Sequence, residues 1–302
     1  MKTKAYKYWL GKGSFQDVAS HQIFVIDTGS SESDGVNCKP VLCILHGFPT
    51  SSFDYCKVLE QLSEKFRVII HDHVGFGFSD KPLDYSYSLI DQTDIALHLW
   101  KKLKINSAII LAHDYGTSIA TELLARDNAG LGAIKIQQLV LCNGSMHIEL
   151  AKLRLMQKLL RNRFIGNYIA KLSNKRILAK NLRNIYYEPS KISQDEIDTI
   201  WSMMNYKNGK DVIAKVSRYT YERQTLWHRW IGALKKTKLP IKIIWPKNDP
   251  IAVAEMANVI KNETKNSKIT WLPNLGHFPM LEAPEYWANE VILAINNPTL
   301  KK

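Results

Sequence analysis

Short apolar runs recur along the chain and are separated by stretches with helical periodicity. Apolar runs bounded by Gly, Pro, Asn or Asp are typical of buried strands, and their alternation with helices is typical of a doubly wound, mostly parallel sheet. The predicted strands are 23–28, 41–45, 68–70, 109–111, 139–142, 241–245 and 268–272. The pattern therefore predicts an α/β fold, and 302 residues are enough for a large core.

Two helical segments bear on a possible site. Residues 118–126 are predicted to form a helix directly after the strand 109–111. Residues 150–172 are predicted to form one amphipathic helix, because apolar residues recur at helical spacing in an otherwise largely basic segment. We expect this helix to bury its apolar stripe over the site; the stripe consists of Leu153, Met156, Leu160, Phe164 and Ile165.

Asp114 occupies the junction between the strand 109–111 and the helix 118–126, with the small residues Ala112 and Gly116 on either side. A sharp strand–turn–helix junction of this kind can expose a nucleophile. A carboxylate there would attack carbon and form an ester on the enzyme. An Asp at such a junction can also simply cap the helix by accepting backbone hydrogen bonds, and this junction alone does not decide between the two roles.

Two glycine-containing loops follow strands in the first third of the chain. The strand 41–45 runs into His46-Gly47-Phe48-Pro49. The backbone N–H groups of this segment could take part in catalysis, or the segment could be an ordinary loop after a strand. The strand 68–70 ends in Asp72 and the loop 75–82. This loop is not a dinucleotide fingerprint, because a third glycine is missing at the required spacing and Pro82 interrupts it. We expect Asp72 to hold backbone in place.

An acid and a histidine follow near the C-terminus. The strand 241–245 leads to Asp249, and the strand 268–272 leads to Gly276-His277. A single histidine beside a proline turn is usually structural. A nucleophile, an acid and a histidine in this chain order, each directly after a strand, are more specific and match the order of a hydrolase triad.

Together these motifs resemble the α/β-hydrolase superfamily, in its branch of epoxide hydrolases and haloalkane dehalogenases, and within it the mesoderm-specific transcript protein group. The resemblance covers nearly the whole chain. The motifs that carry it are HGFPTSSFDY (46–55), GFGFSDKP (75–82), HDYG (113–116), RWIGAL (229–234) and the NDP and GHFPMLEAPE segments around Asp249 and His277.

The resemblance implies a mechanism without metal or organic cofactor. Asp114 would be the nucleophile, and His277, oriented by Asp249, would activate the water that hydrolyses the ester. The backbone N–H groups of Phe48 and Tyr115 would form the oxyanion hole, with His46 and Gly47 as the supporting loop. Some relatives carry an alternative acid after the strand 139–142, but this chain has Asn143 and Gly144 there, so the acid is assigned to Asp249.

The motifs also imply the domain boundaries. The α/β-hydrolase core is predicted to comprise residues 1–144 and 239–302. Residues 145–238 are predicted to form a helical cap inserted after the sixth strand.

The expected substrate class follows from the positions at which this sequence departs from the motifs of the two enzyme types. Haloalkane dehalogenases usually have side-chain donors after the His-Gly and after the nucleophile, whereas this chain has Phe48 and Tyr115. A phenylalanine side chain cannot donate a hydrogen bond to a halide. Epoxide hydrolases use cap tyrosines to protonate the alkoxide, and Tyr219 and Tyr187 are the candidates. We therefore expect an epoxide hydrolase acting on a small apolar organic molecule, with haloalkane dehalogenase as the alternative.

Two other classes remain open. One is a binding protein on the same scaffold without catalysis. The other is an esterase or lactonase using the same triad, which Asp114 disfavours because attack on an ester carbonyl would give an anhydride.

Charge is concentrated in the predicted cap. Residues 152–238 contain 20 Lys and Arg against 6 Asp and Glu, whereas the rest of the chain is nearly neutral. A basic segment can be a solvated lid, can attract an anionic membrane surface, or can steer a substrate with an acidic group. Nucleic acid is a poor fit, because no binding motif accompanies the charge.

Cysteine usage and the N-terminus bear on location. Cys38, Cys43, Cys56 and Cys142 lack metal-site spacing, and two of them fall in predicted strands, so we expect reduced cysteines. The first residues are too polar for a secretory signal. These features favour a cytoplasmic protein whose membrane contact, if any, is peripheral. A monomer and a homodimer both remain open.

Overall fold

The computed structural model describes residues 2–29, 39–144 and 146–297. Its strands are β1 (Ser14–Val18), β2 (His21–Asp27), β3 (Val41–Leu45), β4 (Arg67–His71), β5 (Ser107–His113), β6 (Lys135–Cys142), β7 (Ile241–Pro246) and β8 (Ser267–Leu272). Its α-helices are α1 (Lys4–Lys12), α2 (Leu59–Lys65), α3 (Leu89–Lys102), α4 (Gly116–Asn128), α5 (Leu155–Arg161), α6 (Gly166–Leu172), α7 (Lys175–Arg183), α8 (Gln194–Met204), α9 (Gly209–Val216), α10 (Tyr219–Thr225), α11 (Trp227–Lys236), α12 (Ala254–Glu263), α13 (Pro279–Glu282) and α14 (Pro284–Asn296). Short 3₁₀ helices are η1 (Ser52–Tyr55), η2 (Pro189–Lys191) and η3 (Tyr206–Asn208).

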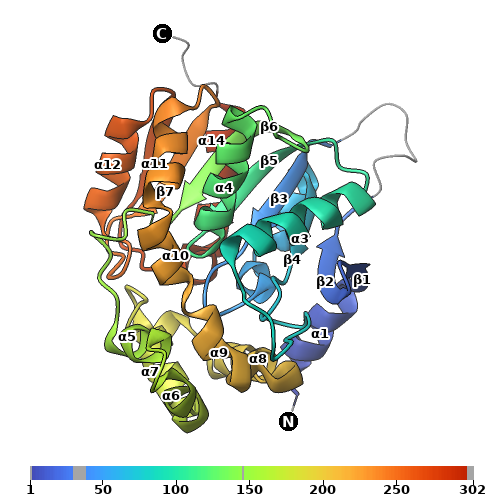
Figure 1. Cartoon of the computed structure of the whole chain (residues 1–302), viewed down its shortest axis with the longest axis vertical. Helices are drawn as coiled ribbons and strands as arrows, with labels where there is room; N and C mark the ends of the chain where they lie inside the picture. The colour runs from blue at the N-terminus through green and yellow to red at the C-terminus, as the bar shows by residue number, and fades with distance from the viewer. Residues whose placement is uncertain (1, 30–38, 145, 298–302) are drawn as a thin grey trace.

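The strands form one sheet with the order β1-β2-β4-β3-β5-β6-β7-β8. β2 pairs antiparallel with both β1 and β4, and the remaining neighbours pair in parallel. All seven predicted strands are confirmed as β2 to β8. The mostly parallel α/β prediction is therefore confirmed, with the antiparallel pair at one edge (Figure 1).

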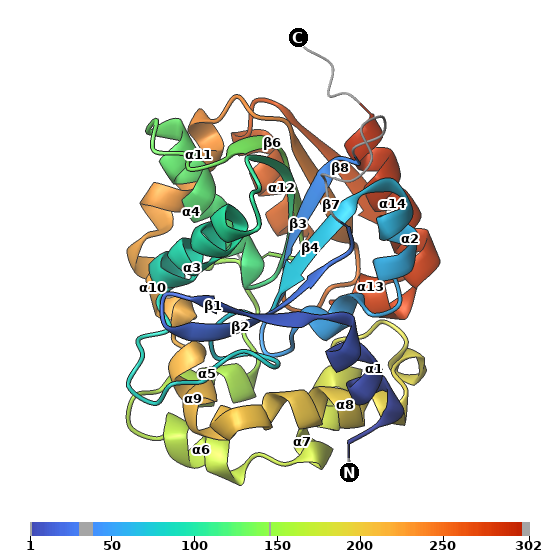
Figure 2. The ribbon, with the colours of Figure 1, turned by 90° about the vertical axis from the view of Figure 1, so that its right-hand side faces the viewer.

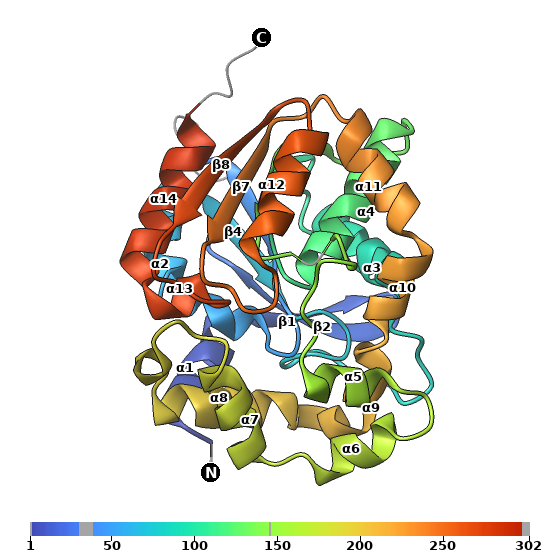
Figure 3. The same cartoon turned by 90° about the vertical axis from the view of Figure 1, so that its left-hand side faces the viewer.

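Helices cover both faces of the sheet, which explains why the central strands are apolar without alternation. Figure 2 and Figure 3 show α2 and α14 on one face and α3, α4, α11 and α12 on the other. Successive residues of a strand enter different cores: Leu42 and Ile44 pack in the cluster that contains residues of α2 and α14. Cys43 and Leu45 pack in the cluster that contains residues of α3 and α4.

The segment between β6 and β7 contains α5 to α11. Helices α5 to α9 lie together at one end of the sheet, away from the C-terminus (Figure 1). Helix α11 instead lies beside α4, where Arg229 and Trp230 both donate hydrogen bonds to Glu122. The division into core and cap remains a prediction. Helix α11 falls within the range predicted for the cap but packs against α4 of the predicted core. Ser145, the first residue of the predicted cap, lies outside the described residues.

The prediction of one helix over 150–172 is wrong. The chain forms α5 and α6 with a turn between them, because the Asn162 side chain accepts hydrogen bonds from the backbone N–H groups of Phe164 and Ile165. A side-chain oxygen that binds backbone N–H groups in this way competes with the helix. The apolar stripe is not buried as a whole either: Phe164 is 86% exposed and Ile165 is 42% exposed.

Two further expectations can be compared with the fold. Cys43 and Cys142 are buried and Cys56 is partly buried, all as free thiols, while Cys38 lies outside the described residues. Asp72 holds backbone as expected, since it accepts hydrogen bonds from the N–H groups of Ser52 and Phe78. In the described part of the chain, every helix is too short or too polar to span a bilayer.

Candidate active site

Asp114 lies on a strained turn between β5 and α4. Its φ is 44°, in the left-handed region that a residue with a side chain rarely adopts. Two glycines permit this geometry. A Cβ on Gly116 would lie 2.2 Å from the carbonyl oxygen of Leu45, and a Cβ on Gly47 would lie 3.0 Å from Cβ of Asp114. The small residues around the junction therefore let strand, loop and helix converge on this carboxylate.

The Asp114 carboxylate is buried and each of its oxygens faces a different group. Oδ1 accepts a hydrogen bond from the backbone N–H of Phe48 at 2.9 Å. Oδ2 lies 3.7 Å from Nε2 of His277. This arrangement leaves Oδ2 beside the histidine while Oδ1 occupies the position next to a predicted oxyanion-hole donor.

His277 and Asp249 form a buried pair. His277 Nδ1 lies 2.7 Å from Asp249 Oδ2. Burial alone would lower the pKa of His277, but the charges of Asp249 and Asp114 outweigh burial and raise it. Burial likewise favours the neutral form of Asp249. The charge of His277 and the hydrogen bonds that Asp249 accepts nevertheless hold the pKa of this carboxyl below its usual range. The pairing therefore keeps Asp249 ionised. Because Asp249 binds Nδ1 of His277, Nε2 of His277 is left directed at Asp114.

Asp249 is anchored by three further donors. Its Oδ1 accepts from the backbone N–H groups of Ile251 and Ala252 at 2.7 and 3.0 Å. Its Oδ2 accepts from the amide of Asn143 at 2.6 Å. Asn143, the residue at the place of the alternative acid, thus contacts the acid itself.

Tyr115 and the loop at His46 pack directly around Asp114. Tyr115 is the residue that follows Asp114, at the start of α4, and its buried ring contacts Phe76 and Tyr219 at centroid distances of 5.1 and 4.9 Å. His46 Nδ1 lies 2.9 Å from the carbonyl oxygen of Gly47, and its Nε2 accepts from the backbone N–H of His73. These contacts fix the loop that presents the Phe48 N–H.

The two candidate cap tyrosines lie in different environments. Tyr219 is 2% exposed, and its ring contacts both Phe48 and Tyr115, at centroid distances of 5.6 and 4.9 Å. Burial raises the pKa of Tyr219, and the Asp114 charge raises it further. Tyr187 is 45% exposed, and neither tyrosine is among the residues that line the cavity described below. Tyr219 therefore packs against the residues that flank Asp114, whereas the Tyr187 side chain is half-exposed to solvent.

Arg223 is a residue of this site that the sequence reasoning missed. It is 1% exposed, and its guanidinium donates from Nε to Ser118 Oγ at 2.7 Å and from Nη2 to the carbonyl oxygen of Asp114 at 2.8 Å. The same guanidinium lies 4.7 Å from the centroid of the Tyr219 ring. The sequence carried a signal for it, because residues four apart on a helix share a face, and Tyr219 and Arg223 are so spaced on α10.

A cavity of about 300 Å³ reaches His277 from the segment between β6 and β7. Phe48, Ile251 and His277 line this cavity together with apolar side chains of α5, α7, α8 and α9. Polar side chains also line it: Arg154, Gln157, Ser173, Asn174, Asn181 and Asn184. A mostly apolar cavity of this size suits a small organic molecule.

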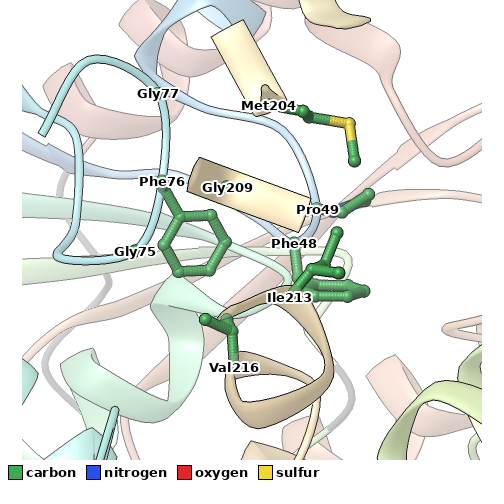
Figure 4. A pocket seen from close by; sticks show the side chains of 9 residues that line it. All are labelled: Phe48, Pro49, Gly75, Phe76, Gly77, Met204, Gly209, Ile213 and Val216. Atoms are coloured by element: carbon green, nitrogen blue, oxygen red, sulfur yellow. The ribbon is translucent and has the colours of Figure 1, made fainter. Parts of the chain in front are cut away.

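A second, much smaller hollow of about 10 Å³ is also lined by Phe48. Figure 4 shows Phe48, Ile213 and Val216 close together, with Phe76 facing them and Met204 nearby. Phe48, Pro49, Met204 and Ile213 line both spaces. The wall beside the Phe48 N–H is therefore apolar.

Comparison with known families decides what kind of protein carries this site. Residues 40–284 match the family described as alpha/beta hydrolase fold. The chain belongs to this α/β-hydrolase family. The matched region includes Asp114, Asp249 and His277, and the resemblance found in the motifs is confirmed.

Relatives of this α/β-hydrolase match over almost the whole chain. LipZ of Mycobacterium tuberculosis, described as a hydrolase, is 31% identical over 97% of this chain and 98% of its own length. The mesoderm-specific transcript homolog protein of Bos taurus is 33% identical, over 96% of this chain and 87% of its own length.

Solved structures share the fold. The epoxide hydrolase CorEH has a TM-score of 0.74 at 16% identity, over 94% of this chain and 98% of its own. The haloalkane dehalogenase DbeA from Bradyrhizobium elkani has a TM-score of 0.76 at 21% identity, over 92% of this chain and 95% of its own. Both enzyme types are thus similar to this α/β-hydrolase in architecture.

Proposed function

We propose that this α/β-hydrolase uses Asp114 as a nucleophile and hydrolyses apolar epoxides. The observation that carries the proposal is the position of the Asp114 carboxylate, with one oxygen on the Phe48 N–H and the other 3.7 Å from His277 Nε2. A carboxylate that served only as a helix cap would accept its hydrogen bonds from the N–H groups of its own helix. A mostly apolar cavity is lined by Phe48 and His277, the two residues that the carboxylate oxygens face.

In the first step, Asp114 Oδ2 attacks an epoxide carbon. A bond forms between Oδ2 and that carbon while the carbon–oxygen bond of the ring breaks, and the leaving alkoxide takes the hydroxyl proton of Tyr219. Tyr219 suits this role because its raised pKa keeps it protonated and its ring lies between Phe48 and Tyr115. The product is a hydroxyalkyl ester on Asp114.

In the second step, water attacks the carbonyl carbon of this ester. Nε2 of His277 takes a proton from the water, and the imidazolium is stabilised by Asp249 at 2.7 Å. The backbone N–H groups of Phe48 and Tyr115 stabilise the tetrahedral oxyanion, at about 3 kcal/mol per donor. Collapse of the intermediate breaks the ester bond, and the leaving alkoxide of the diol takes the proton from His277. Asp114 is left as a carboxylic acid, and the net transfer of its proton to the Tyr219 phenolate through solvent restores both groups.

Halide release is the alternative first step, because the same carboxylate can displace a halide. The surroundings favour the epoxide. Phe48, whose backbone N–H binds Asp114 Oδ1, has no side-chain donor for a halide. Tyr219, whose pKa is raised by burial and by the Asp114 charge, can protonate an alkoxide.

Replacing Tyr219 with Phe tests the epoxide assignment. We expect kcat for an apolar epoxide to fall by about 10²-fold, the usual contribution of a general acid. Turnover of a bromoalkane by the same variant should be almost unchanged, since bromide leaves without a proton. The measurement is steady-state kinetics with both substrates.

Tyr221→Phe is the matched control, because Tyr221 lies on the same helix but is 40% exposed. It should behave as the wild type. Full epoxide turnover by Tyr219→Phe would remove Tyr219 from the mechanism, and bromoalkane turnover without epoxide turnover in the wild type would favour the dehalogenase.

A further inference from the structure

The α5–α6 surface exposes large apolar side chains. We use this name for α5, α6 and the turn between them. Its exposed apolar residues are Leu155 (71%), Phe164 (86%), Ile165 (42%), Tyr168 (70%) and Leu172 (72%). Tyr168 and Leu172 are four residues apart on α6 and share a face, and Phe164 and Ile165 lie in the turn that enters it. Several neighbouring exposed apolar side chains mark an interaction site.

The chain segment that carries this surface has charge of one sign. Between Glu149 and Glu188 the chain has ten Lys and Arg and no Asp or Glu. Most of these basic residues are exposed; they are Lys152, Arg154, Lys158, Arg163, Lys171, Lys175, Arg176 and Lys180. Arg163 lies in the turn beside Phe164, and Lys171 lies beside Leu172. Apolar side chains interspersed with cations fit the boundary between acyl chains and anionic headgroups.

The position of the surface also fits a membrane. Helices α5 to α9 lie together at the end of the molecule opposite the C-terminal end of α14 (Figure 2). Leu155 belongs to the α5–α6 surface and also lines the cavity that reaches His277. A lipid-soluble molecule at this end would therefore lie next to the cavity.

A second copy of this chain fits less well. A symmetric pair would place the same surface against itself, and the exposed basic residues Lys158, Arg163 and Lys171 of the two copies would face one another without acidic partners on that surface. An anionic bilayer supplies the missing negative charge and apolar volume together.

We propose that the α5–α6 surface docks onto anionic membranes, with Phe164, Tyr168 and Leu172 at the acyl boundary and the basic residues on the headgroups. The docking does not depend on the reaction at Asp114.

Co-sedimentation of the full chain with vesicles tests the docking. We use phosphatidylcholine alone and phosphatidylcholine with about 30 mol% phosphatidylglycerol, since the attraction requires anionic lipid. We expect the protein to sediment with the anionic vesicles, to dissociate from them at high salt and to stay in solution with phosphatidylcholine. Phe164→Ser/Tyr168→Ser and Arg163→Glu/Lys171→Glu should each weaken partitioning by about tenfold or more.

Matched controls carry the same changes elsewhere. Leu131→Ser/Leu293→Ser removes two exposed apolar side chains outside the segment, and Lys101→Glu/Lys135→Glu makes the same change in net charge. Both should bind as the wild type does. The proposal is overturned if no vesicle binds, if pure phosphatidylcholine binds equally well, or if the α5–α6 variants bind as tightly as their controls. It is also overturned if sedimentation velocity finds a dimer that Phe164→Ser/Tyr168→Ser dissociates, with no vesicle binding.

Discussion

Replacement of Asp114 with Asn is expected to lower kcat by roughly 10⁴-fold or more, as loss of a nucleophile does in comparable enzymes. The amide is nearly the same shape, and its oxygen can still accept the hydrogen bond from Phe48 N–H, but it is a far weaker nucleophile than a carboxylate. The change therefore removes the chemistry while leaving the turn intact. The measurement is kcat with a panel of apolar epoxides and bromoalkanes.

Asp84→Asn is a suitable control, because it makes the same chemical change at an exposed Asp and should leave kcat unaltered. Thermal unfolding of Asp114→Asn should resemble that of the wild type. Residual turnover well above the uncatalysed rate, in a preparation free of deamidated protein, would mean that another group attacks the substrate.

Acidification is the second change with a large expected effect, because four histidines besides His277 are buried around the site. His46, His71 and His73 form a row of rings with centroid distances of 4.2 Å (His46 to His73) and 4.9 Å (His71 to His73). Burial lowers the pKa of His46 to about 4 and that of His71 to about 3. Burial also lowers the pKa of His113 to about 4 and lowers the pKa of His73.

The sign of the pH dependence follows from these shifts. In the unfolded chain each histidine has a pKa of about 6.5, so between about pH 6.5 and 4 the unfolded state binds protons that the folded state excludes. The free energy of unfolding should therefore decrease as the pH falls through this window. For His46, His71 and His113 together we expect a loss of about 5 kcal/mol between pH 7 and pH 5. His277 acts in the opposite direction and offsets part of this, because its pKa is raised and its contribution is fully present below about pH 6.5.

Urea unfolding at pH 7 and pH 5 measures this difference. His71→Leu should reduce it by about 2 kcal/mol, because it removes one buried titrating group. Neither ring nitrogen of His71 has a hydrogen-bond partner within the described ranges, so the variant should lose little stability at pH 7. His228→Leu, at an exposed position, is the control. An unchanged pH dependence in His71→Leu would show that this histidine does not titrate on unfolding.

Local patterns were sufficient to predict much of the fold. β2 to β8 were predicted because apolar runs ended by Gly, Pro, Asn or Asp depend little on distant contacts. β1 and α1 were not predicted, since an edge strand and a terminal helix bury few side chains and carry a weak pattern. The helix 150–172 was predicted wrongly because a periodic pattern does not reveal that one side chain, Asn162, binds the backbone and ends the helix.

The candidate site was predictable where its residues directly follow strands. Asp114, Asp249 and His277 each follow a strand of a parallel sheet, so the topology brings them to the same end. Arg223 and the difference between Tyr219 and Tyr187 were not predictable in this way. Their burial depends on how the helices between β6 and β7 pack on the sheet, and that packing is a long-range property.

Capture of the covalent intermediate tests the proposed mechanism most directly. In His277→Gln the ester can still form, but its hydrolysis lacks the general base, so the ester should accumulate. Mass spectrometry after incubation with an apolar epoxide should find one adduct, heavier by the mass of the whole epoxide and mapped to the peptide that contains Asp114. Asp114→Asn/His277→Gln should give no adduct. A folded His277→Gln protein that forms no adduct with any epoxide or bromoalkane, or an adduct on another residue, would contradict Asp114 as the nucleophile.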